Sequence, residues 1–127
     1  MKQKSYYYKR IDRLMHELSV ATEIIKIVQN EIAERNIERI STVKLKIGAM
    51  AGIDPEALKF SFKAASAKTS LAGAILDIDW LVVKGKCKSC GKNFEIDDLV
   101  FMCPHCDSAD ITITQGEELN IAYIIEG

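Results

Sequence analysis

Apolar side chains recur every three or four residues in the first third of the chain, behind a polar leader. Charged and amide side chains occupy the positions between them. This spacing is typical of an amphipathic helix with one buried face. It predicts a helix from about residue 16 to about residue 36, with a buried stripe formed by Leu18, Ala21, Ile25, Val28 and Ile32.

Three later segments alternate apolar and polar residues, as half-buried strands do. They cover residues 41–48, 76–83 and 119–125. The buried face of the last strand is predicted to carry Leu119, Ile121, Tyr123 and Ile125.

A second helix is predicted to begin at Asp54-Pro55-Glu56, between the first two strands. Asp is a favourable N-cap and Pro suits the first helical turn. Glu in that turn is stabilised by the positive end of the helix dipole.

This order of elements predicts an α+β fold in which two helices lie on a three-stranded mixed sheet. Residues 15–85 and 115–127 are expected to form this domain, with a zinc-ribbon-like module at residues 86–114 inserted between two strands. Residues 1–14 are polar apart from three consecutive tyrosines, and we expect a poorly ordered N-terminal extension there.

Four cysteines in the predicted module have the spacing of metal ligands. Cys87 and Cys90 form one C-x-x-C motif, and Cys103 and Cys106 form a second after twelve intervening residues. Two such turns can place four thiolates tetrahedrally around zinc, and four thiolates leave no open position for water. The zinc is therefore expected to be structural.

The residues between the two motifs support this prediction, and the second motif also contains a histidine. Phe94, Ile96 and Leu99 alternate around Asp97-Asp98, which is typical of a short hairpin. His105, inside the second motif, is either a solvent-facing imidazole or an alternative zinc ligand.

Composition decides between metal binding and disulfide bonding for these cysteines. The chain of 127 residues has no apolar run long enough to span a membrane, and its start lacks the features of a secretory signal. A cytoplasmic protein with reduced thiols is expected, where four cysteines are more often metal ligands than disulfides. A dithiol redox role is the main competitor.

Charge and residue content argue against two other classes of function. The formal net charge is −1 and the basic residues form no stripe, which disfavours nucleic-acid binding. The chain has only two histidines and lacks both a Ser-His-Asp set and a phosphate-binding glycine loop, so we do not expect an enzyme.

His16 stands with Glu17 at the start of the first predicted helix. Judged by chemistry alone, a histidine in this position is more often simply exposed than a metal ligand. However, Met15-His16-Glu17-Leu18-Ser19, the strand Val43–Gly48 and the paired C-x-x-C motifs resemble, in this order, the HypA/HybF family. The resemblance covers essentially residues 15–127.

The resemblance implies a nickel metallochaperone for hydrogenase maturation, with a structural zinc on the cysteines. His16 is implied as the primary nickel ligand together with nearby backbone nitrogens, and Glu17 as its neighbour. A square-planar nitrogen field suits Ni(II), although it would also hold Cu(II). Asp54 matches an acidic position near the nickel site of some members, but its role as a helix cap already explains it.

One departure concerns the start of the chain. In the family the Met-His-Glu triplet begins the chain, so its free α-amine can bind the metal, whereas here fourteen residues precede it. Either Met15 is the true start, or the extended form binds nickel differently and more weakly.

The function expected from the resemblance is delivery of Ni(II) to a hydrogenase large-subunit precursor during maturation of nickel–iron hydrogenase. The nickel GTPase HypB and that precursor are the expected partners, and a homodimer is an open alternative to a monomer. The alternative from another class is a zinc-ribbon module that binds nucleic acid or protein.

Overall fold

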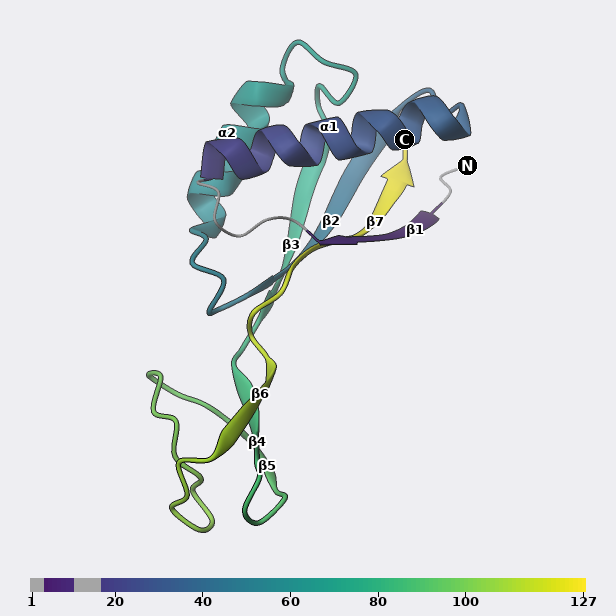
Figure 1. Ribbon diagram of the computed structural model, residues 1–127. Helices are drawn as coiled ribbons and strands as arrows, with labels where there is room; N and C mark the ends of the chain where they lie inside the picture. The colour runs from purple at the N-terminus through teal and green to yellow at the C-terminus, as the bar shows by residue number, and fades with distance from the viewer. Residues whose placement is uncertain (1–3, 11–16) are drawn as a thin grey trace.

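The computed structural model describes residues 4–10 and 17–127, which form two helices and two sheets (Figure 1). Both helices lie against one face of the larger sheet, and the smaller sheet extends away from it with the cysteine loops. Neither helix is both long and apolar enough to cross a membrane. In chain order the elements are β1 (Lys4–Arg10), α1 (Glu17–Arg35), β2 (Ile40–Gly48), α2 (Pro55–Ser66), β3 (Ile75–Leu81), β4 (Lys84–Cys87), β5 (Asn93–Glu95), β6 (Ile111–Gln115) and β7 (Leu119–Glu126).

The larger sheet has the strand order β1-β7-β2-β3. Strands β2 and β3 are parallel, whereas β7 is antiparallel to both β2 and β1. The predicted mixed sheet of three strands beneath two helices is therefore confirmed. Its centre is β2, where Val43, Leu45 and Ile47 are fully buried beneath the helices.

Strand β1 is a fourth strand that was not predicted from the sequence. Lys4–Arg10 lies in the segment expected to be an N-terminal extension, and it pairs with β7. Two physical reasons account for the difference. Consecutive tyrosines have a high strand propensity, and β7 has an edge on the side away from β2 that can accept a further strand.

The buried face of α1 includes Ala21, Ile25 and Val28 of the predicted stripe and extends further to Val20, Ile24 and Ile27. Val20, Ile24 and Val28 are fully buried, whereas Leu18, which was predicted to be buried, is 60% exposed. The buried arc is wider than a single stripe because α1 packs against α2 and shares one core with the sheet, whereas Leu18, the second residue of the helix, lies before the buried residues begin.

The burial of side chains in β7 differs from the predicted alternation, because the strand contains a β-bulge. Lys44 lies opposite Tyr123 but Leu45 lies opposite Ile121, so one residue of β7 is unpaired with β2. Because an extra residue reverses the side-chain alternation beyond it, Ile124 is buried in place of Tyr123 and Ile125. Leu119 and Ile121, before the bulge, are buried as predicted.

The cysteine module contains the smaller sheet, with the order β5-β4-β6. The hairpin predicted between the two motifs does not form, because β5 pairs instead with β4 across the first motif. Ile96 is buried as a core residue of the module. Asp98 and Leu99 adopt positive φ angles of 51° and 57°, which end the extended backbone.

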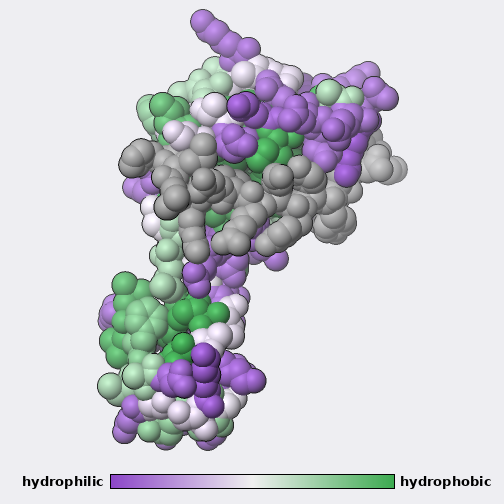
Figure 2. Space-filling view, in the orientation of Figure 1, coloured by the Kyte–Doolittle hydropathy of each residue, from purple (hydrophilic) through white to green (hydrophobic). Residues whose placement is uncertain are grey.

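Apolar side chains also lie on the surface of this module. The exposed ones between the two motifs are consecutive in the chain: Leu99, Val100, Phe101 and Met102. Figure 2 shows the module as a separate lobe with apolar surface on the face in view. The predicted alternation from Phe94 to Leu99 therefore buries Ile96 but not Leu99, whose side chain is 60% exposed.

The two parts of the chain meet where β2 passes the connection between β6 and β7. The Gly48 N–H donates to the Glu118 carbonyl at 2.8 Å, and the Met50 N–H donates to the Gly116 carbonyl at 2.7 Å. A Cβ on Gly48 would overlap the Gly116 carbonyl group, so only glycine fits this approach.

Candidate metal centres

Each C-x-x-C motif forms the same backbone turn. In the first, the Cys87 N–H donates to the Lys92 carbonyl and the Gly91 N–H donates to the Cys87 carbonyl. In the second, the Cys103 N–H donates to the Ser108 carbonyl and the Asp107 N–H donates to the Cys103 carbonyl. The two loops are thus built alike, although their sequences differ outside the cysteines.

The residue that closes each turn has a left-handed conformation. Gly91 has φ +78° and Asp107 has φ +61°, and each lies four residues after the first cysteine of its motif. Glycine adopts this conformation without strain, and aspartate is among the few other residues that tolerate it. Gly91 therefore relieves the first turn, and Asp107 has the matching role in the second.

The four cysteine sulfurs converge on one point and suit a tetrahedral metal ion. The Cys87 and Cys106 sulfurs are 3.6 Å apart, as are those of Cys90 and Cys103, and all four lie within 4.8 Å of one another. For comparison, Zn–S bonds of about 2.3 Å imply tetrahedral S···S distances of about 3.8 Å. The cysteines are free thiols, and the set fills a four-coordinate shell without leaving an open position.

Hydrogen bonds from backbone N–H groups stabilise the thiolate form of two of the cysteines. The Cys90 N–H donates to Cys87 Sγ at 3.5 Å, and the His105 N–H donates to Cys103 Sγ at 3.4 Å. The hydrogen bond from the Cys90 backbone is the largest cause that lowers the pKa of Cys87 to about 6. For Cys106, a hydrogen bond from the Ser108 backbone lowers the pKa, but hydrogen bonding to Cys87 and burial outweigh it and raise the pKa to about 12. Without a cation, one sulfur of this pair therefore keeps its proton, and a bound metal displaces it.

Side chains outside the cysteines connect the two turns. The hydroxyls of Ser89 and Ser108 are 2.9 Å apart, and the Lys88 ammonium lies 3.9 Å from an Asp110 carboxylate oxygen. These contacts were not predicted from the sequence, because each joins residues about twenty positions apart and no local spacing signals them. His105 contributes its backbone N–H to the site while the residue itself is exposed.

A second group of potential ligands lies where α1 and α2 begin. Glu17 is the first residue of α1, and its carboxylate accepts a hydrogen bond of 3.2 Å from the Asp54 N–H. His16 lies outside the described residues, but it is bonded directly to Glu17. The structure therefore brings together two of the three predicted nickel-site residues, Glu17 and Asp54, which are 37 positions apart.

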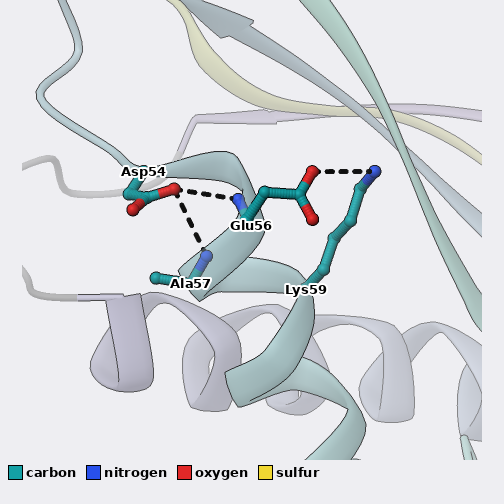
Figure 3. A network of polar contacts seen from close by, with 4 residues as sticks. All are labelled: Asp54, Glu56, Ala57 and Lys59. Carbon is teal, nitrogen blue, oxygen red and sulfur yellow. Dashed lines mark hydrogen bonds and ion pairs between the residues drawn. The ribbon is translucent and has the colours of Figure 1, made fainter.

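Asp54 caps the N-terminal end of α2, as predicted from the sequence, and Figure 3 shows its contacts with Glu56 and Ala57. Its Oδ1 accepts hydrogen bonds from the Glu56 N–H at 3.0 Å and from the Ala57 N–H at 3.4 Å. Glu56, in the same first turn, lies 3.8 Å from the Lys59 ammonium. The capping role is confirmed, and it places a carboxylate beside the start of α1.

Substitution of Asp54 separates its capping role from its charge. Asp54→Ala is expected to destabilise the fold by about 1 kcal/mol because two N–H groups of α2 lose their acceptor. Asp54→Asn keeps an acceptor oxygen and is expected to leave the free energy of unfolding within about 0.5 kcal/mol of wild type. Chemical denaturation followed by circular dichroism measures both changes. Equal losses in the two variants would show that the charge, and not the cap, sets the stability.

Comparison with known proteins places this arrangement in a family. Residues 15–125 match the family model described as "Hydrogenase/urease nickel incorporation, metallochaperone, hypA". The hydrogenase maturation factor HypA of Desulfitobacterium hafniense is 40% identical over 105 residues, which cover 83% of this chain and 92% of that protein. The factor of the same name from Chlorobium luteolum is 46% identical over 112 residues, covering 87% of this chain and 95% of that protein.

Solved structures give the same result. The solution structure of the Ni metallochaperone HypA from Helicobacter pylori superimposes with a TM-score of 0.61 at 28% identity, covering 87% of this chain and 96% of that one. A second solution structure of a HypA protein gives a TM-score of 0.69 at 27% identity, covering 89% of this chain and 97% of that one. With its two helices on a mixed sheet and its four-cysteine cage, the chain belongs to the HypA family of nickel-incorporation metallochaperones.

Proposed function

We propose that this protein binds Ni(II) at His16 and delivers it to a hydrogenase large-subunit precursor, while the four cysteines hold a structural zinc ion. The observation that carries the proposal is the match of residues 15–125 to the nickel-incorporation family, since that range includes His16, Glu17 and all four cysteines. On this view the protein makes and breaks only metal–ligand bonds and is not an enzyme.

The position of Glu17 and Asp54 supports a metal site at the start of α1. Both residues carry carboxylates, and both lie at the N-terminal end of a helix, next to the backbone that leads to His16. An imidazole with backbone nitrogens supplies the ligand field that Ni(II) accepts. Glu17 and Asp54 would then contribute negative charge beside the cation, in addition to their hydrogen bond.

The chemistry of the two centres suits two different tasks. The cysteine cage is closed, because its sulfurs fill a tetrahedral shell, and such a shell suits a zinc ion that fixes the shape of the module. Transfer requires ligands that can be replaced one at a time. The Glu17–Asp54 contact is exposed, so an incoming partner can reach a metal held there.

The proposed partners follow from the family. They are the hydrogenase large-subunit precursor, which receives the nickel, and the nickel GTPase HypB, which takes part in its supply. We place the protein in the cytoplasm, because four cysteines that bind a metal and form no disulfides are typical of a reducing compartment. The zinc-ribbon alternative that binds nucleic acid is disfavoured by the net charge of −1.

Nickel transfer to the precursor tests the proposed function. The full chain is loaded with one equivalent of Ni(II) and mixed with a nickel-free hydrogenase large-subunit precursor and a chelator that captures free nickel. The precursor is expected to gain nickel from the wild-type protein but not from His16→Ala, with His105→Ala as the control that removes the other histidine. Equal transfer from His16→Ala and wild type would refute the proposal.

A further inference from the structure

Strand β3 forms one edge of the larger sheet and pairs only with β2 among the described residues. The Ala49 N–H donates to the Leu81 carbonyl at 2.9 Å, so the backbone groups of Leu81 point toward β2. Backbone polar groups alternate between the two sides of a strand. Those of Leu76, Ile78 and Trp80 therefore point toward the outer edge, where another strand can pair with them.

A groove adjoins the start of this edge. It lies between α2 and the first residues of β3, and it has a volume of about 530 Å³. Its lining includes the apolar side chains of Phe62, Ala67, Ala74 and Leu76. Ile75 also lines it, and this side chain is 65% exposed at the beginning of β3. The groove thus offers an apolar surface directly beside an open strand edge.

Two lysines give the groove a positive rim. Lys59 and Lys63 are one turn apart on α2, and both line the groove. Both residues are exposed, and the ion pair of Lys59 with Glu56 is long, at 3.8 Å. An apolar surface bordered by two ammonium groups favours a ligand that combines apolar side chains with carboxylates.

We propose that the outer edge of β3 and this groove bind an extended segment of a partner protein that carries an apolar residue and an Asp or Glu two positions apart. The segment pairs as an additional strand with Leu76, Ile78 and Trp80. Because every second side chain of a strand lies on the same face, an apolar side chain enters the groove beside Phe62 while a carboxylate two positions away reaches Lys59 and Lys63. This surface is formed by α2 and β3, so the proposal goes beyond nickel binding at His16 and stands independently of it.

Selection from a random library of linear octapeptides, displayed on phage, tests the proposal on the immobilised full-length protein. Enriched peptides are expected to carry an apolar and an acidic residue two positions apart. Trp80 is the single tryptophan of the chain and is 44% exposed on β3, so its fluorescence should change when the synthesised peptides bind. Lack of enrichment, or enrichment of peptides without acidic residues, would overturn the proposal.

Two matched comparisons test the charge and the strand pairing separately. Lys63→Glu is expected to weaken binding of an enriched peptide roughly tenfold, whereas Lys68→Glu, which reverses an exposed lysine outside the groove, should not. The same peptide is also N-methylated at every second residue, at the positions whose N–H groups would face β3. These positions can then no longer donate hydrogen bonds to the strand edge, so the peptide is expected to lose binding. Equal affinity for the two lysine variants, or for both N-methylation registers and the unmodified peptide, would refute the proposed mode.

Discussion

Cys103→Ala is expected to unfold the cysteine module while the helices and the larger sheet remain folded. Cys103 is fully buried, and it contributes one of the four sulfurs as well as two backbone hydrogen bonds to its turn. The module has a small sheet and few buried apolar side chains of its own. Metal binding must therefore supply most of its stability, on the order of 10–16 kcal/mol in zinc-finger peptides.

Amide hydrogen exchange resolved by residue measures this outcome. Amides of residues 84–115 are expected to lose protection in Cys103→Ala, whereas those of α1, β2 and β7 keep it. His105→Ala, in the same turn, is the control, because the His105 side chain is exposed. Loss of protection throughout the chain would contradict the description of the module as an inserted unit.

Gly48→Ala is expected to destabilise the larger domain by about 3 kcal/mol. The added methyl group would meet the backbone of the β6–β7 connection, where it overlaps the Gly116 carbonyl group and lies 2.7 Å from the Glu117 nitrogen. Backbone cannot move aside as a flexible side chain can. Relief of the clash would therefore break the hydrogen bonds that Gly48 and Met50 make with this connection.

Denaturant unfolding followed by circular dichroism measures the effect, with Gly52→Ala as the matched control. Gly52 has φ +76°, and a methyl group at this position would have no atom within 4 Å, so only the backbone conformation opposes the substitution. That cost is about 1 kcal/mol. Equal losses at the two positions would show that the close approach at Gly48 does not determine stability.

The parts of the fold that the sequence predicts correctly depend on local chemistry. The cysteine cage follows from two short motifs whose turns are built within six residues. The cap at Asp54 follows from three consecutive residues and is observed as predicted. The alternation in β2 predicts its buried face because that strand is regular on the side of β3.

The parts that the sequence does not reveal depend on contacts between distant residues. The bulge in β7 changes which side chains are buried, although the local alternation continues through Ile125. Leu18 fits a helical stripe but lies outside the contact with α2 and the sheet. The contact of Glu17 with Asp54 joins two helix starts, and neither local sequence contains a signal for it.

The central claim is that His16 holds nickel separately from the cysteine cage, and calorimetric titration of Ni(II) into the zinc-loaded protein tests it most directly. Wild type and His105→Ala are expected to bind nickel with similar affinity, whereas His16→Ala is expected to bind at least about tenfold more weakly. The zinc content of all three should be the same. Unchanged nickel affinity in His16→Ala, both in the full chain and in a form that starts at Met15, would contradict the claim.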